Sequence, residues 1–285
     1  MHNRVIKHLK AVHVMAKSNF SSWFHSSRTT IMLLFVAAFC FVVANNHNQS
    51  LKELNYELHF GESVFLLLSN GCSITTTSIL FLIAISELPK RIGYQYSLLI
   101  RASRVKWLES QIIYCFWMVL GMLALTVVCT LVFVAPSVTP GSDWSETMRT
   151  ATKTIQENGA AVPIFIRSTF TPLTACLLAM IPMFFFWITM IFIVLLFGLC
   201  RLPLVGLMTY AIMLVADVVF MVESISNFPM PIYYATLDNI LANAKGLELQ
   251  RIYEVLLGYC IVIVVLLICM FVSVHKADLY FQAEE

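Results

Sequence analysis

The sequence predicts an all-α, polytopic membrane protein, and three observations lead to this fold class. Of the 285 residues, 59% are hydrophobic and only 12% are charged, whereas soluble domains carry about 25% charged residues. So few charges cannot cover the surface of a water-soluble protein of this size. The apolar residues also form long uninterrupted runs, unlike the alternating strands of about 10 residues in a membrane barrel. Helices are the remaining way to satisfy a backbone in lipid.

Six apolar runs are long enough, or nearly so, to cross about 30 Å of hydrocarbon, which takes about 20 helical residues. They are Thr29–Ala44, Glu62–Ser86, Trp107–Ala135, Phe170–Leu199, Pro203–Val222 and Glu254–Val274. The first run is short, and we expect its helix to begin near Ser26. We therefore expect residues 1–285 to form one transmembrane domain with six transmembrane helices.

The composition and motifs also exclude several classes of function. The net charge of +2 gives no reason to expect a nucleic-acid partner. The eight cysteines lie within or at the ends of apolar runs, and none forms the CxxC pair of a metal site. The chain has no GxxxxGK[ST] phosphate loop, no GxSxG and no HExxH. We therefore expect a non-catalytic protein with no metal and no cofactor of its own.

The basic residues predict the orientation. With the N-terminus inside, 12 of the 18 Lys and Arg residues fall in cytoplasmic segments and 6 in outer segments. The positive-inside rule favours this arrangement, so we expect a cell-membrane protein with both termini in the cytoplasm. The outer loops are then residues 136–168 and 223–252. The second is partly apolar, which suits a segment at the interface or one that dips back into the bundle.

Two of the cytoplasmic segments have helical periodicity. In residues 1–25, Val5, Leu9 and Val12 recur at helical spacing beside lysines, which predicts an amphipathic helix on the anionic inner leaflet. A flexible basic tail is the alternative. Residues 87–106 (ELPKRIGYQYSLLIRASRVK) are too charged to span and too periodic for a plain linker. They predict a short cytosolic helix that contacts a soluble partner, or an interfacial helix held only by lipid.

Polar residues within the apolar runs mark a second candidate region. In the run Glu62–Ser86 they share two helical faces, one with Ser69, Ser73 and Thr76 and one with Asn70, Ser73 and Thr77. Such residues avoid lipid, so they face either other helices or a water-filled path. Asp217 is the only acidic residue well within the fifth run. An intramembrane carboxylate indicates function by default, although water near the outer end of the helix would also accommodate it.

The predicted plan comprises a basic N-terminal helix, a cytosolic helix after the second span, a tight inner turn at residues 200–202 and a partly apolar outer segment before the sixth span. Three short stretches read LPKRIG at 88–93, LIRASRVKW at 99–107 and KADL at 276–279. This plan and these stretches resemble the membrane subunit of a type-two ATP-binding-cassette (ABC) exporter. In that family the loop after the second span is the coupling helix that docks on the ATPase. The long outer loop 136–168 departs from the family, in which this loop is usually short.

The resemblance implies a permease subunit that works as a dimer with an identical or paralogous chain. ATP and Mg²⁺ would be bound by a separate cytosolic ATPase. The implied ATPase-docking residues are Lys90, Arg91, Tyr94, Leu98, Arg101 and Arg104. The expected residues of a translocation path are Ser69, Asn70, Ser73, Thr76, Thr77 and Asp217. The alternatives are an autonomous secondary transporter or channel and a non-transporting scaffold or sensor, and the sequence does not identify the substrate.

Overall fold

The computed structural model of the protein describes residues 2–54, 59–89, 103–139, 141–146, 148, 164–222, 233–242 and 248–276. Within these ranges the regular structure is helical, apart from one isolated bridge between His59 and Thr139. This confirms the predicted all-α class. The predicted docking residues from Lys90 to Arg101 lie outside the described residues.

The long helices follow the predicted apolar runs. In the described part of the chain, four helices are long and apolar enough to cross a membrane. They are α2 (Ser27–Leu54), α6 (Arg104–Val134), α10 (Pro172–Leu199) and α13 (Glu248–Lys276). A fifth candidate span exists if the bent pair α3 (Phe60–Ser69) and α4 (Gly71–Ile85) is counted as one. α11 (Pro203–Val222) is also apolar. Its part from Pro203 to Ala216 is shorter than these candidate spans. The protein is therefore a helical membrane protein.

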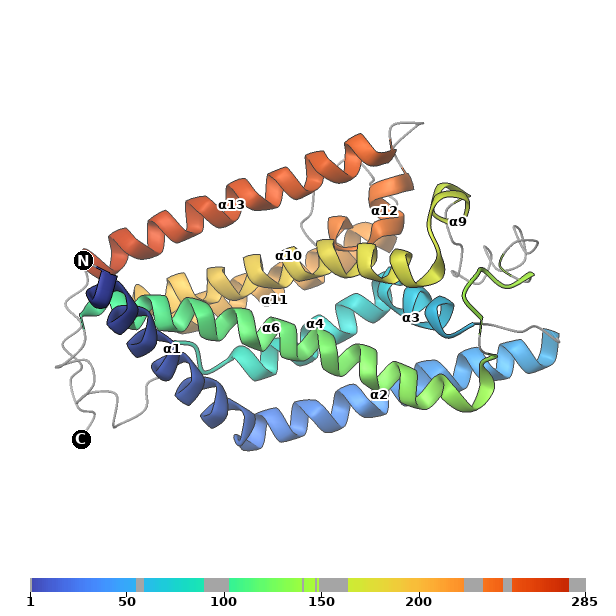
Figure 1. Ribbon diagram of the computed structural model, residues 1–285, viewed down its shortest axis with the longest axis horizontal. Coiled ribbons are helices and arrows are strands. Elements are labelled where there is room, and N and C mark those ends of the chain that lie inside the picture. Colours follow the sequence, from blue (N-terminus) through green and yellow to red (C-terminus); the bar gives the residue numbers. More distant parts are fainter. Residues whose placement is uncertain are drawn as a thin grey trace.

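The helices run along the long axis of the molecule (Figure 1). We call the end that holds the start of α6 and the end of α10 the terminal end, because α1 (His2–Phe24) also begins there and α13 ends there (Figure 1). The distal end holds η1 (Ala135–Ser137), α9 (Ile164–Thr169) and the start of α10 (Figure 1).

α10 forms the centre of the bundle and α13 its edge. α10 packs against α3, α4, α6, α11 and α13. In its most apolar stretch of 18 residues 61% is buried, compared with 11% in the corresponding stretch of α13. The side chains of Phe186, Trp187 and Phe192 on α10 are fully buried. α13 therefore presents most of its apolar surface to the surroundings, as a helix at the edge of a bundle in lipid does.

A single serine joins three helices in the middle of the bundle. The indole Nε1 of Trp187 on α10 donates to Ser78 Oγ on α4 at 2.8 Å. The hydroxyl of Tyr210 on α11 donates to the backbone carbonyl of Ser78 at 3.1 Å. Polar side chains inside a membrane bundle are stabilised by such interhelical bonds. The two bonds at Ser78 fix the position of α4 along its axis relative to α10 and α11.

The N-terminal helix is present as predicted, but one of its faces packs on protein. Val12, Ala16 and Trp23 of α1 are buried, and α1 lies along α6. His8 bonds Glu109 at 2.5 Å, and Phe20 contacts the ring of Trp117 with centroids 5.8 Å apart. The later residue of α1 contacts the later residue of α6, so the two helices run in the same direction. These contacts attach α1 to the bundle, so it is not held by lipid alone.

The second outer loop is partly folded. The described residues 233–242 form η2 (Tyr233–Ala235) and α12 (Leu237–Ala242), and Leu237 and Ile240 are fully buried. The described apolar residues of this segment thus pack against α10 and α13. α13 begins at Glu248, so the last residues of the predicted outer loop 223–252 are helical.

Because α10 and α11 pack closely in a tight hairpin, we expect alanine substitution to affect stability differently at two glycines. A Cβ added at Gly206 would lie 2.9 Å from Phe197 Cβ and 3.1 Å from the backbone of Val194, whereas a Cβ at Gly258 would meet nothing within 4 Å. We expect Gly206→Ala to lower the free energy of unfolding by about 1–3 kcal/mol through overpacking. The matched control Gly258→Ala should leave it unchanged or raise it by up to about 1 kcal/mol, because alanine is the better helix former.

Thermal unfolding of the two purified variants in the same detergent measures this difference. Equal unfolding temperatures for the two variants would contradict the close packing of α10 against α11.

Candidate functional site

The predicted second span is broken in its middle. α3 and α4 meet at Asn70 with a bend of 75°, so the prediction of one continuous helix over Glu62–Ser86 is wrong. Asn70 is extended, with φ −79° and ψ 117°, and its side chain accepts a hydrogen bond from the backbone N–H of Ser73 at 3.3 Å. Asn is a preferred N-cap residue because its side chain replaces a missing backbone acceptor. The Asn70-Gly71 pair ahead of small polar residues was the signal for this new helix start.

The bend rearranges the predicted polar faces. Ser69 ends α3, whereas Ser73, Thr76 and Thr77 belong to α4, so Ser69 no longer shares a helical face with them. The hydroxyls of Thr76 and Thr77 donate to the carbonyls of Cys72 and Ser73, both at 2.8 Å. This local bonding lets hydroxyl groups lie in apolar surroundings. Asp217 lies in α11, and its side chain is outside the described part of the structure.

The break lies at a depth that hydrocarbon would occupy. The 15 residues of α4 rise about 22 Å from the charged residue Glu87, while the hydrocarbon is about 30 Å thick. The first backbone N–H groups of a helix have no acceptor within that helix, and the described residues offer none to Gly71 or Cys72. Lipid offers none either, so irregular backbone at this depth requires protein or water beside it. The exposed face of α4 at Cys72 therefore borders a polar or protein-covered space.

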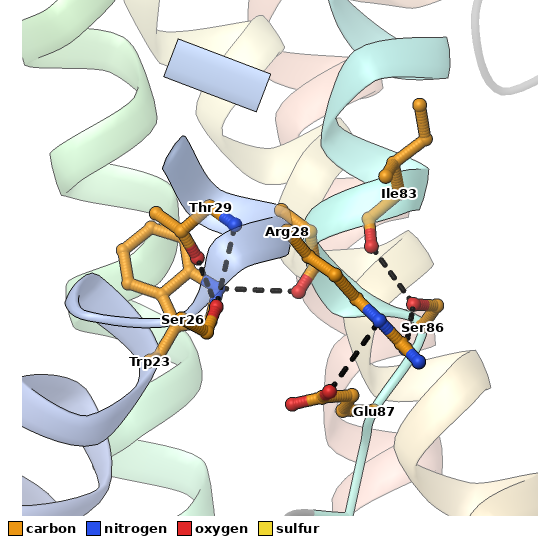
Figure 2. Close-up of polar contacts among 8 residues, drawn as sticks. Trp23, Ser26, Arg28, Thr29, Ile83, Ser86 and Glu87 are labelled. Atoms are coloured by element: carbon orange, nitrogen blue, oxygen red, sulfur yellow. Dashed lines mark hydrogen bonds and ion pairs between the residues drawn. The ribbon is translucent and has the colours of Figure 1, made fainter. Parts of the chain in front are cut away.

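The corner between α1 and α2 is bonded to the end of α4 and the residues that follow it (Figure 2). Trp23 Nε1 donates to the carbonyl of Ala84 at 3.1 Å. Arg28 donates to Ser86 Oγ at 2.9 Å and pairs with the Glu87 carboxylate at 3.5 Å. We call these five residues the junction. Its ion pair is exposed and adds little stability, whereas the buried indole of Trp23 fixes the position of α4.

The two residues that follow the junction are packed against the end of α10. Leu88 and Pro89 are buried, and Pro89 lies so close to Gly198 at the end of α10 that a side chain there would collide with it. At the other side of residues 90–102, Ser103 caps α6 by accepting from Lys106 N at 3.4 Å. Arg104 therefore begins α6, so the last three residues of the predicted cytosolic helix 87–106 belong to the next long helix.

α6 carries a buried polar group that the sequence reasoning missed. Gln111 is fully buried, and among the described residues neither its amide nitrogen nor its amide oxygen has a partner. The buried indole of Trp107, one turn earlier, also has an unpaired Nε1 there. Each such unpaired group costs about 1–3 kcal/mol. A lone glutamine within an apolar run was the available signal.

The described residues contain no group of three or more His, Cys, Asp or Glu side chains that could hold a metal ion. Comparison of the chain with protein-family models, with curated proteins and with solved structures gives no match. The two ends of residues 90–102 are attached to α4 and α6, and α4 carries the polar break at Asn70.

The junction predicts a local effect of Trp23→Phe. The substitution removes the bond to Ala84 and keeps an aromatic ring, so it should weaken the attachment of α4 by about 1 kcal/mol. Hydrogen exchange should then become faster at the amides of Ser86 and Leu88, which bond Ile83 and Ile85. The measurement is mass spectrometry of the peptide covering residues 83–89.

The control is Trp187→Phe, which also removes an indole bond to α4 but does so at Ser78, in the middle of the bundle. If both variants accelerate exchange at residues 83–89 equally, the junction is not a separate attachment point.

Proposed function

We propose that the protein is the permease subunit of an ATP-driven exporter of the ABC class, powered by a separate cytosolic ATPase. In this proposal α2, the broken pair α3–α4, α6, α10, α11 and α13 are six spans. Both termini are cytoplasmic, so the terminal end is the cytoplasmic end of a cell-membrane protein. ATP and Mg²⁺ belong to the partner, and this chain performs no chemistry.

The observation that carries the proposal is the attachment of residues 90–102 at both of their ends. On one side, Trp23 and Pro89 fix the end of α4 against α1 and α10. On the other, the Ser103 cap begins α6, which His8 ties to α1 through Glu109. A soluble motor that binds this segment would therefore act next to the packed ends of two helices, α4 and α6.

The break at Asn70 supports a path along α4. A stripe on one helical face of α4 consists of the exposed Cys72, Ile79 and Ile83 and the half-buried Thr76. The unpaired N–H groups beside it need water or protein. We propose that a second permease chain, identical or paralogous, faces this stripe across a water-filled path. The remaining apolar surface, including that of α13, contacts the lipid bilayer. The cargo then meets Asn70, Thr76 and the start of α4 as polar groups in an otherwise apolar wall.

The proposal predicts that charge reversal at Arg101 and Arg104 weakens binding of the ATPase. In Arg101→Glu/Arg104→Glu, like charges would face each other across an interface, which costs several kcal/mol and lowers affinity at least about tenfold. The measurement is the amount of phosphate-loop ATPase that co-purifies with the tagged chain from its native membrane, together with ATP hydrolysis by the complex.

The matched control is Arg149→Glu/Lys153→Glu, the same reversal in the long loop between α6 and α10, which should leave the ATPase bound. If the complex and its activity survive in both double variants, the coupling role of residues 87–106 is wrong. Transport that needs no ATPase and is lost in Asp217→Asn would favour an autonomous secondary transporter instead.

A path along α4 also predicts different reactivity among exposed cysteines. Cys72 on α4 and Cys260 and Cys269 on α13 are all exposed, but only Cys72 borders the proposed path. Because the thiolate is the reactive form and needs water, a charged methanethiosulfonate should modify Cys72 many-fold faster than either cysteine of α13. Peptide mass spectrometry of protein in lipid vesicles measures each site. Equal resistance of all three, with labelling only by a lipophilic maleimide, would place the face of α4 in lipid.

A further inference from the structure

Residues 141–146 and Met148, from the long loop between α6 and α10, pack onto the distal end of the bundle. Trp144 is buried against Phe65 of α3, with ring centroids 5.8 Å apart and planes at 88°. Its Nε1 donates to the carbonyl of Phe170 at 2.7 Å, just before α10. Ser145 and Met148 are buried as well. This part of the loop is thus packed between α3 and the start of α10.

A buried carboxylate holds this loop. Glu62, in the first turn of α3, is 0% exposed. Its two oxygens accept hydrogen bonds from separate segments, one from His59 N at 2.8 Å and one from Ser145 N at 2.5 Å. A buried charge is tolerated only when it is well bonded, and bonds from N–H groups to a carboxylate are among the strong ones. Glu62 therefore supplies the contact that joins the loop to α3.

Two further contacts close the loop around the same point. The ring of His59 lies against Gly141, where a side chain would collide with it, and His59 Nδ1 is 2.5 Å from the carbonyl of Asp143. Arg167, in α9, donates to the carbonyl of Met148. Apart from the buried indole of Trp144, these loop contacts use backbone groups of the loop, so they depend on its conformation rather than on its exposed side chains.

We infer that residues 141–146 and Met148 form a cap that closes the distal end of the bundle, and that Glu62 is its latch. Glu62 sits on α3, which adjoins α4 at the bend of Asn70. A shift of α4 that changes the bend moves Glu62 relative to Ser145 and opens the cap. The use of the cap as an exit gate rests on the proposed permease function, whereas the cap and its latch do not.

A native cysteine next to Glu62, at the contact between α3 and α10, reports opening at this point. Cys176 near the start of α10 is buried, and its Sγ donates to the carbonyl of Gly61 at 2.9 Å, next to Glu62. Cys115 is fully buried on α6 and reports global unfolding. Modification of a buried thiol follows the population of the open form. The two thiols therefore separate a local opening from loss of the fold.

The test is modification of the full-length protein in lipid vesicles by a charged methanethiosulfonate, read at each cysteine by peptide mass spectrometry. We expect Glu62→Ala to raise the rate at Cys176 by roughly tenfold or more, since it removes two bonds to a charged group, and Cys115 to stay unmodified. Glu62→Gln, which keeps one acceptor oxygen, should give a smaller rise. Asp143→Asn is the matched control. It removes an exposed carboxylate from the same loop, keeps the backbone carbonyl that meets His59, and should leave the rate at Cys176 as in the wild type.

If Glu62→Ala also exposes Cys115, that variant has lost its fold, and Gly141→Val serves as the second test. It displaces the His59 ring without touching the buried carboxylate, and the inference requires faster modification of Cys176 with Cys115 protected. Unchanged modification of Cys176 in Glu62→Ala and Gly141→Val, with the fold intact, would overturn the cap. Because the assay contains no nucleotide and no ATPase, its outcome is independent of whether the chain is a permease.

Discussion

A helix that is interrupted within hydrocarbon must find hydrogen-bond partners outside itself, and the break at Asn70 imposes this requirement on the whole structure. The side chain of Asn70 satisfies one backbone N–H of α4, and the hydroxyls of Thr76 and Thr77 bond carbonyls within their own helix. The N–H groups of Gly71 and Cys72 are left over, and Cys72 is exposed. Since lipid cannot satisfy them, this face of α4 is the part of the surface that demands water or a protein neighbour.

The contacts of α4 determine how a movement of that helix would spread. Ser78 ties its middle to α10 and α11, and the junction ties its end to α1 and α2. α10 is buried on most sides, and a packed core resists gradual deformation. A displacement of α4 is therefore expressed at the bend and in α3. α3 carries Glu62, so the terminal and distal ends of the bundle are physically connected through one broken span.

The apolar runs predicted helices well because burial in lipid requires the same composition along a whole span. α11 has the predicted bounds Pro203–Val222, and α6 departs from its predicted bounds by three residues at the start and one at the end. The break was missed because two short apolar helices in sequence resemble one long run. Gln111 was missed because a single polar residue hardly alters an apolar run. The docking residues from Lys90 to Arg101 and the role of Asp217 stay predictions.

By itself the sequence determined that the chain lies in a lipid membrane and that its long elements are helices. With only 12% charged residues the chain belongs in a membrane, and lipid then requires helices of a certain length. Only the tertiary structure decided what individual polar residues do. Glu62 was read as the boundary of a span, yet it is fully buried and binds Ser145 across 83 positions of the chain. The reason is physical: composition and periodicity report local preference, whereas a buried charge is stabilised by whichever distant backbone groups the fold brings to it.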